Sequence, residues 1–278
     1  MTPAKSSLTW SPRSLFGAIV NPTAPRTGAR RRADIPPELL ARLNHGEIES
    51  VTLAEALAID FAALLHAFAP RMPRFALDEM RVAATSGVTQ RMALAGRLLL
   101  QHFGPTAYGL LATHRSDTLR GWAAYLLAAM DDLTLPERLL LVRPLANDPN
   151  AGVREWAWIA LRPHIAADIE YSIDLLTAWT ASDSHCLRRF TSEATRPRGV
   201  WCAHIGRLKR TPALGLPILE PLRADPHKYV QDSVSNWLND AAKSQPAWVR
   251  TLCARWRRES PCPATERICR RALRSLKD

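Results

Sequence analysis

The sequence predicts an all-α protein, built as a HEAT-like helical repeat solenoid with a basic concave face. Apolar residues recur at three- and four-residue spacing, and no segment alternates apolar and polar residues over a useful length. Similar segments also recur at a spacing of 34 residues or more, which is typical of helical repeat proteins. The chain of 278 residues carries a formal charge of +11, most of it from arginine.

The N-terminal part divides into an arm and the first helices. Residues 1–33 are rich in Pro, Ser, Thr and Arg without periodicity, which predicts a flexible basic arm, and residues 34–278 are predicted to form one solenoid domain. The first helix is expected in IPPELLARLNHGEIES, with proline in its first turn and Gly46 after its end. The segment TLAEALAIDFAALLHAF is predicted as one strongly amphipathic helix.

Four later segments share a common form: DTLRGWAAYLL, DPNAGVREWAWIAL, DSHCLRRFTSEA and DPHKYVQDSVSNWL. Aligning their polar residues Arg120, Arg154, Arg188 and Gln231 gives steps of 34, 34 and 43 residues. ERICRRALRSL continues the series, and QRMALAGRLLL is a weaker earlier copy. We expect the aspartate of each copy to cap the inner helix of a helix pair. The alternative is a generic helical bundle with accidental similarity.

Positive charge is concentrated in two stretches of the chain. Residues 187–210 hold seven basic residues and one acidic residue, and residues 247–278 hold nine basic and three acidic residues. Such segregation favours a polyanion partner, with DNA or RNA ahead of an anionic membrane. Arginine also suits phosphate recognition. A GC-rich genome would equally explain the ratio of arginine to lysine, although not the net charge.

Several classes of protein are disfavoured. The five cysteines include no CxxC and match no standard ligand spacing, so we expect no metal, and reduced thiols indicate the cytosol. No signal peptide and no apolar run of transmembrane length is evident. No glycine-rich phosphate loop is present, and the histidines lack a partner motif for nucleophilic catalysis.

Three motifs in successive repeats combine acidic and aromatic residues. GVREWAWIALRP contains Glu155, SEATRPRGVW contains Glu193 and Trp201, and SVSNWLNDAAK places Asn236 and Asp240 on one helix face. Stacking of the repeats could bring all three motifs to one place on the groove. Structural roles are the alternative: a solvated ion pair for Glu155, a tie between repeats for Asn236 and Asp240, and core packing for the tryptophans.

Together, VREWAWIALRP, SEATRPRGVW and YVQDSVSNWLNDAAKSQP resemble the corresponding segments of the HEAT-repeat alkylpurine DNA glycosylases. This is the AlkC/AlkD superfamily, and the resemblance is greatest to its AlkC branch. It runs from about Asp117 to the C-terminus. The sequence has Ala194 where the family has glycine, Gly199-Val200 where it has Leu-Pro, and Gln231-Asp232 where an arginine is common.

The resemblance implies a metal-independent DNA repair enzyme without a cofactor, which hydrolyses the N-glycosidic bond of cationic N3- or N7-alkylated purines in double-stranded DNA. It places Glu155, Glu193, Trp201 and Asp240 at catalytic positions. The residue chemistry agrees, because a cationic base leaves readily and needs mainly negative charge near C1′ and a carboxylate to orient water. A tryptophan can stack on the cationic base.

We therefore expect Glu193 and Asp240 to face the sugar, Glu155 to support them and Trp201 to stack. The residues expected to contact DNA phosphates are Arg154, Arg188, Arg189, Arg196, Arg198 and Lys243. We expect a monomer in the cytoplasm, associated with the nucleoid and not with a membrane. Two alternatives are a non-catalytic HEAT-repeat protein that binds DNA and a HEAT scaffold for an acidic protein. Acids within a basic groove favour the enzyme.

Overall fold

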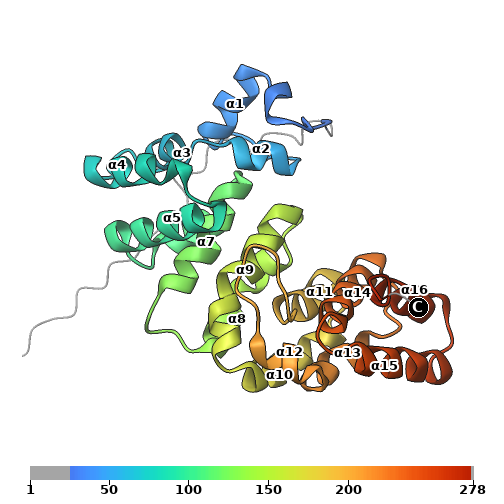
Figure 1. Cartoon of the computed structure of the whole chain (residues 1–278). Helices are drawn as coiled ribbons and strands as arrows, with labels where there is room; N and C mark the ends of the chain where they lie inside the picture. The colour runs from blue at the N-terminus through green and yellow to red at the C-terminus, as the bar shows by residue number, and fades with distance from the viewer. Residues whose placement is uncertain (1–25, 277–278) are drawn as a thin grey trace, which may run out of the picture.

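The computed structural model describes residues 26–276, and all the regular structure in this range is helical, as predicted (Figure 1). The α-helices are α1 (Pro37–Asn44), α2 (Leu53–Ala58), α3 (Phe61–Phe68), α4 (Arg74–Val82), α5 (Val88–Phe103), α6 (Ala107–Ala112), α7 (Asp117–Ala129), α8 (Leu135–Ala146), α9 (Ala151–Ala167), α10 (Ile169–Thr177), α11 (His185–Ala194), α12 (Gly206–Arg210), α13 (Leu216–Leu222), α14 (Lys228–Ala242), α15 (Pro246–Glu259) and α16 (Pro263–Ala272). Short 3₁₀ helices cover Arg32–Asp34, Ala83–Thr85, Ala178–Ala181 and Pro212–Gly215.

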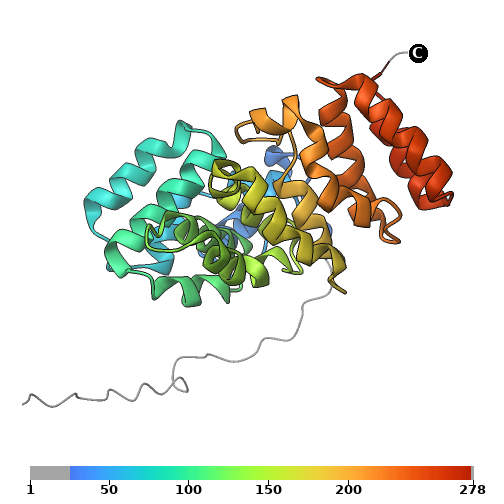
Figure 2. The same ribbon diagram turned by 90° about the horizontal axis from the view of Figure 1, so that it is seen from below.

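One row of helices runs through the molecule. Helices α5, α7, α9, α11, α14 and α16 pack side by side in this order, while α8, α10, α13 and α15 lie between them in sequence and pack against the row from one side. In the view of Figure 2 the helices are stacked from the teal N-terminal half at the left to the red α15 and α16 at the right. In Figure 1, α1 and α2 lie above α7, and α14–α16 lie to the right of α9. This is the predicted helical repeat, with α7, α9, α11 and α14 as its inner helices.

The aligned polar residues of the repeat have one structural role in common. Nη1 of Arg154 donates to the carbonyl oxygens six and five residues earlier, at 2.6 and 2.9 Å. Nη1 of Arg120 and Nη1 of Arg188 do the same, and the amide of Gln231 donates to the carbonyl six residues earlier at 2.8 Å. The register predicted from the sequence is therefore confirmed, because equivalent residues close the turn before each inner helix.

The aspartates of the repeat do not cap the inner helices, so that prediction was wrong. Two of them, Asp148 and Asp225, lie two residues before the N-cap and reach the preceding repeat, where they accept from Arg120 at 2.7 Å and Arg188 at 2.6 Å. The residues that cap α7, α9, α11 and α14 are Ser116, Asn150, Ser184 and His227. These two aspartates thus join neighbouring repeats instead of capping helices.

The segment predicted as one helix after α1 forms two helices, α2 and α3. The side chain of Asp60 accepts from the backbone amides of Ala62 and Ala63, and so caps α3 and breaks the helix before it. Helix α1 begins with proline as predicted. Gly46 follows its end with φ of +69°, a conformation that favours glycine.

Most of the predicted arm, residues 1–33, lies outside the described residues, but its described end is attached to α2. Arg26 donates to both carboxylate oxygens of the buried Glu55, at 2.6 and 2.7 Å. The backbone amides of Ala29 and Val51 donate to the same carboxylate. Burial opposes ionisation of Glu55, but these hydrogen bonds outweigh it and lower its pKa to about 2. At least one arginine of this stretch therefore has a structural partner.

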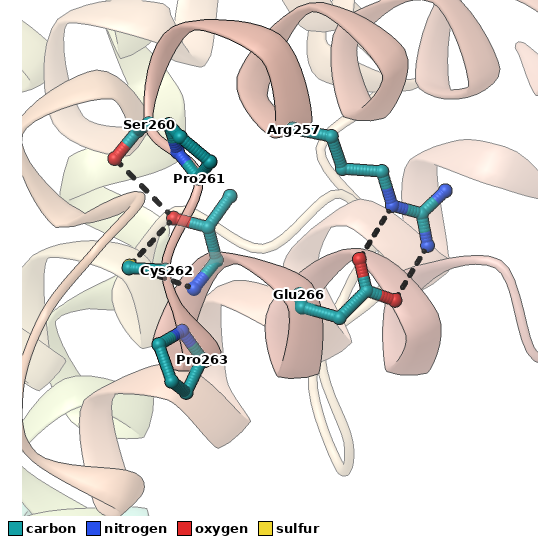
Figure 3. A pocket seen from close by; sticks show the side chains of 7 residues that line it. Arg257, Ser260, Pro261, Cys262, Pro263 and Glu266 are labelled. Carbon is teal, nitrogen blue, oxygen red and sulfur yellow. Dashed lines mark hydrogen bonds and ion pairs between the residues drawn. The ribbon is translucent and has the colours of Figure 1, made fainter.

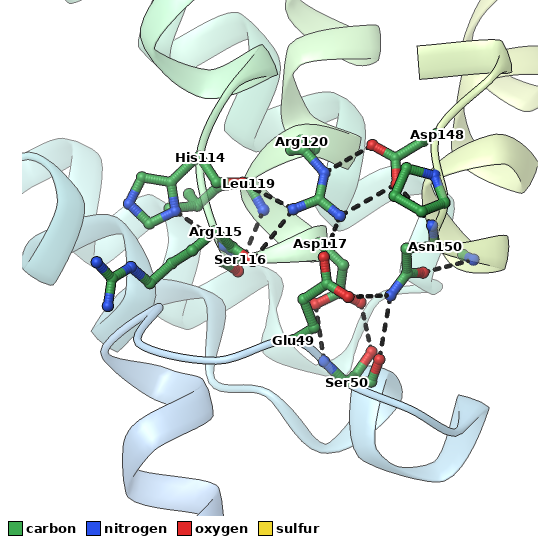
Figure 4. A network of polar contacts seen from close by, with 12 residues as sticks. Glu49, Ser50, His114, Arg115, Ser116, Asp117, Leu119, Arg120, Asp148 and Asn150 are labelled. Carbon is green, nitrogen blue, oxygen red and sulfur yellow. Dashed lines mark hydrogen bonds and ion pairs between the residues drawn. The ribbon is translucent and has the colours of Figure 1, made fainter. Parts of the chain in front are cut away.

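A polar network joins the loop before α2 to the starts of α7 and α9 (Figure 4). Ser50 donates to Asp117 through its backbone amide, at 2.9 Å, and through its hydroxyl. Glu49 accepts from Arg120 and from the side-chain amide of Asn150, the latter at 3.2 Å. The N-terminal helices are thus tied to the same repeat arginine that bridges two inner helices.

Candidate active site

Three carboxylates alternate with three basic side chains across α9, α11 and α14, and we call this set the charged row. The N···O distances between successive members are 2.6, 3.5, 2.7, 2.8 and 3.7 Å. Stacking of the repeats therefore brings the three predicted acids together, although each pair of acids is separated by an arginine. In order, the charged row is Glu155, Arg189, Glu193, Arg196, Asp240 and Lys243.

Glu193 lies at the centre of the charged row and is 3% exposed. Its Oε1 accepts from Arg196 at 2.7 Å, and its Oε2 accepts from the hydroxyl of Ser233 at 2.7 Å. Burial would raise the pKa of Glu193, but the charges of Arg189 and Arg196 outweigh it and lower the pKa below the ordinary value. The carboxylate is therefore fixed in place and ionised.

Asp240, on α14, is 4% exposed and has the opposite pKa shift. Arg196 contacts its Oδ2 at 2.8 Å, and Lys243 lies 3.7 Å from its Oδ1. Burial raises the pKa of Asp240 despite the opposing attraction of these two cations. The two buried carboxylates thus share one arginine but differ in how readily they take up a proton.

Glu155 is the most accessible acid of the charged row, with 35% of its side chain exposed. Its Oε2 accepts from the indole nitrogen of Trp158 at 2.7 Å, and its Oε1 contacts Arg189. The sequence predicted Glu155 as a supporting group and the other two acids as the groups that face the sugar. In the structure Glu155 is the carboxylate that solvent reaches most readily.

Trp201 lies on the turn that connects α11 to α12. It has φ of +58°, which is rare for a residue with a side chain, and it is 46% exposed. Its ring stacks on the buried Trp156, with centroids 6.0 Å apart and planes 15° apart. Backbone strain of this kind persists where the surrounding structure fixes it, often at functional sites. One face of the indole is thus fixed while much of the side chain remains accessible.

The basic residues predicted to contact phosphates are largely occupied within the protein. Arg154 and Arg188 bind backbone carbonyls of the turns before their own helices, and three others, Arg189, Arg196 and Lys243, belong to the charged row. Arg198 donates to the hydroxyl of Ser244 at 2.8 Å. Lys243, with half of its side chain exposed, is the most accessible of the six.

Sequence reasoning missed the part played by Tyr229. Two guanidinium groups contact its ring, with Cζ of Arg189 at 4.2 Å and Cζ of Arg154 at 5.1 Å from the ring centroid. The tyrosine thereby links the first turn of α14 to α9 and α11 beside the charged row. It stands at the start of the third motif, but a tyrosine in sequence gives no sign of which arginines it will contact.

The polar residues around Asp240 tie α14 to α16. The amide of Asn239 donates to the backbone carbonyl of Ala272 at 2.9 Å, and Arg274 donates to Asn236 at 2.9 Å. The tie between repeats that was the structural alternative for Asn236 is therefore present. The carboxylate of Asp240 is bound by Arg196 instead.

The structure contains two hollows near the helices of the repeat. One, of about 490 Å³, adjoins Trp201 and is lined mainly by apolar residues of α5, α7 and α9. The other, of about 360 Å³, lies at the turn between α15 and α16, where Cys262 caps α16 and Arg257 pairs with Glu266 (Figure 3).

Within residues 26–276 no group of three or more His, Cys, Asp or Glu side chains could hold a metal ion. No helix in that range is long and apolar enough to cross a membrane.

Comparisons with known proteins find similarity in the region that contains the charged row. Residues 151–266, which contain all of the charged row, match the family described as DNA alkylation repair enzyme. The chain is 39% identical over 117 residues to the uncharacterized protein YhaZ of Bacillus subtilis (strain 168), a match that covers 42% of this chain and 32% of that protein. The chain thus spans about a third of the length of this curated relative.

Solved structures extend the comparison to the fold. The alkylpurine DNA glycosylase AlkC of Pseudomonas fluorescens, bound to DNA containing an abasic site analog, has 27% sequence identity and a TM-score of 0.61, over 85% of this chain and 64% of AlkC. AlkD2 of Streptococcus mutans shares the fold, with 17% identity and a TM-score of 0.58 over 74% of this chain and 100% of AlkD2. The chain is thus similar to the DNA alkylation repair enzyme family over residues 151–266, and its fold is similar to those of AlkC and AlkD2.

Proposed function

We propose that the protein is a metal-independent DNA glycosylase, which hydrolyses the N-glycosidic bond of cationic N3- or N7-alkylated purines in double-stranded DNA. The observation that carries the proposal is the pair of buried carboxylates, Glu193 and Asp240, fixed on either side of Arg196. A protein that bound phosphates alone would gain nothing from two acids at this place. The similar AlkC is an alkylpurine DNA glycosylase and is bound to DNA in its structure.

The chemistry requires little beyond electrostatics. When the bond from C1′ to the purine nitrogen breaks, its electron pair leaves with the cationic base, which becomes neutral, and positive charge develops on the sugar. Water then adds to C1′ and loses a proton to a carboxylate. Negative groups that are already fixed stabilise this transition state without reorganising during the reaction. The buried acids of the charged row satisfy that condition.

The three acids differ in solvent exposure, and we assign them different roles on this basis. Glu155 is the carboxylate that water can reach, so we assign to it the orientation and deprotonation of the nucleophile. Glu193 and Asp240 act through their negative charge. A DNA phosphate that binds to Arg189 or Arg196 would leave these carboxylates less neutralised, which increases the negative potential at the sugar. Trp201 offers its exposed indole to the cationic base.

Release of the base tests the proposal directly. The purified protein, incubated with methylated double-stranded DNA, is expected to release 3-methyladenine or 7-methylguanine and to leave abasic sites, with and without a chelator. Free bases are measured by chromatography, after subtraction of the release from DNA incubated alone. A wild-type protein that binds the DNA but releases neither base would contradict the proposed activity.

A second candidate is binding of damaged DNA without hydrolysis. It is favoured by the pairing of every acid of the charged row with a guanidinium group in the DNA-free structure. The two candidates share the prediction of salt-dependent DNA binding. They differ in the abasic product, which only the glycosylase forms.

The pKa of Asp240 predicts an acid limit for the activity. Because burial raises that pKa, base release is expected to fall on acidification at a higher pH than an ordinary aspartate would give, while Glu193 stays ionised. Replacing Lys243 by methionine removes a cation that favours the ionised form, so the limit moves to higher pH. Single-turnover rates measured as a function of pH check this. Lys243→Arg keeps the charge and serves as control, and an equal shift in both variants would contradict the assignment.

A further inference from the structure

We propose that Arg162 is a positioning residue, which fixes the turn carrying Trp201 and thereby sets the rate of base release without touching DNA. The proposal rests on the glycosylase function proposed above. Arg162 lies on α9, two turns after Glu155, and is 2% exposed. Its side chain therefore cannot reach a phosphate, and its role must be exerted through the groups that it contacts.

The guanidinium group of Arg162 holds both ends of one turn. It donates to the carbonyl oxygens of Ala194 at 2.9 Å and Arg196 at 2.5 Å, at the end of α11. It also donates to the carbonyl oxygen of Ala203 at 3.1 Å, which follows Trp201 by two residues. One planar, rigid guanidinium group thus binds two carbonyls before Trp201 and one after it. Lysine cannot reproduce this geometry.

Packing alone does not fix this turn. Trp201, Cys202 and Ala203 line one side of the hollow of about 490 Å³, so the turn has space behind it. Its outer side is solvent, since Val200 is 55% exposed and Trp201 46% exposed. The positive φ of Trp201 also has to be maintained against its intrinsic cost. The bonds from Arg162 supply the constraint that a filled core would otherwise supply.

The sequence of the turn makes room for the arginine. A Cβ atom added to Gly199 would lie 3.1 Å from Cζ of Arg162 and 2.3 Å from the sulfur of Cys202. The absence of a side chain at Gly199 thus lets the guanidinium group approach the backbone of the turn. Arg196 of the charged row has its carbonyl on the same fork. Arg162 therefore places the stacking residue and the central arginine relative to each other.

The test compares Arg162→Lys with Arg138→Lys in the full chain. Arg138 is an equally buried arginine on α8 that donates to three backbone carbonyls, those of Leu127, Ala128 and Met130, and makes no contact with the turn. It therefore controls for the loss of a buried carbonyl-binding fork. Both proteins are labelled with 5-fluorotryptophan, and the ¹⁹F signal of Trp201 is identified by its absence in Trp201→Phe.

In Arg162→Lys the ¹⁹F signal of Trp201 is expected to shift or broaden in the DNA-free protein. The single-turnover rate on saturating methylated DNA should fall about 100-fold, as for a misplacement of about 1 Å. The Kd for DNA should change by less than about threefold. Arg138→Lys should lower thermal stability without moving the Trp201 signal. If Arg162→Lys does not fold, Arg162→Gln, which retains an amide donor but not the fork, takes its place and should move the same signal.

Three outcomes overturn the proposal: an unchanged Trp201 signal in folded Arg162→Lys, an equal change of that signal in Arg138→Lys, or a rate loss no greater than that of Arg138→Lys. Failure of the proposed function is a separate result. In that case the wild-type protein releases no base, while the ¹⁹F signal still decides whether Arg162 positions Trp201.

Discussion

Replacing Glu193 by glutamine is expected to lower the single-turnover rate of base release by about 10²–10³-fold, as the loss of one preorganised electrostatic group does in other enzymes. Glutamine has nearly the same shape, so the turn and the stack of Trp201 on Trp156 should persist. What disappears is the negative charge that Arg189 and Arg196 keep ionised. The Kd for DNA and its salt dependence should remain close to those of the wild type, because no phosphate contact is removed.

The same substitution also breaks a buried ion pair, which by itself lowers the stability of the fold by about 3–5 kcal/mol. Asp225→Asn separates the two effects. Asp225 is buried, is bound by Arg188 at 2.6 Å and likewise joins α11 to the region of α14, but it lies outside the charged row. Comparable loss of stability in both variants, with base release lost only in Glu193→Gln, is the expected pattern. Equal loss of activity in both would make the effect structural and contradict the catalytic assignment.

The repeat and its register could be predicted from the sequence, because each copy uses residues with local consequences. Arginine or glutamine at the aligned position binds carbonyls five or six residues earlier, so the constraint that selects it lies within one segment. The break between α2 and α3 depends on Asp60 acting as a cap. The sequence did not predict this break, because the apolar periodicity runs through the whole segment and indicates one helix.

The surroundings of the candidate site could not be predicted in the same way. Motifs place Glu155, Glu193 and Asp240 in successive repeats, but how deeply each is buried depends on how three helices pack. The sequence allowed a solvated ion pair for Glu155, but it did not rank the exposure of the three acids or identify Arg189 as the partner of Glu155. The partners of the site residues could not be predicted either, because they lie on other segments of the chain. Asp240 contacts an arginine on another repeat. Several arginines that were predicted to contact phosphates bind carbonyls or carboxylates of the protein instead. The catalytic roles stay predictions.

Replacing Arg120 by methionine is expected to lower the free energy of unfolding by about 3–5 kcal/mol, because it leaves buried polar partners without their donor. Arg120 contacts Asp148 at 2.7 Å, two carbonyls of the turn before α7, and Glu49 of the N-terminal segment (Figure 4). The charge of Asp148 would then be buried and unpaired. Urea unfolding followed by circular dichroism measures the loss. Arg97→Met, which breaks an exposed pair with Glu79, should change stability by less than about 1 kcal/mol.

The repeat architecture also predicts where the Arg120 variant loosens. In a solenoid each unit contacts mainly its neighbours, so hydrogen exchange should accelerate in α1–α7 and the start of α9, while α14–α16 keep their protection. Arg188→Met removes the equivalent ion pair two repeats further along the chain. There the carboxylate partner is Asp225, and the N-terminal segment is not involved. It should leave the exchange of α1–α3 unchanged. Uniform acceleration throughout the chain in either variant would show that the repeats unfold as one unit, and that the N-terminal helices do not depend on Arg120 for their attachment.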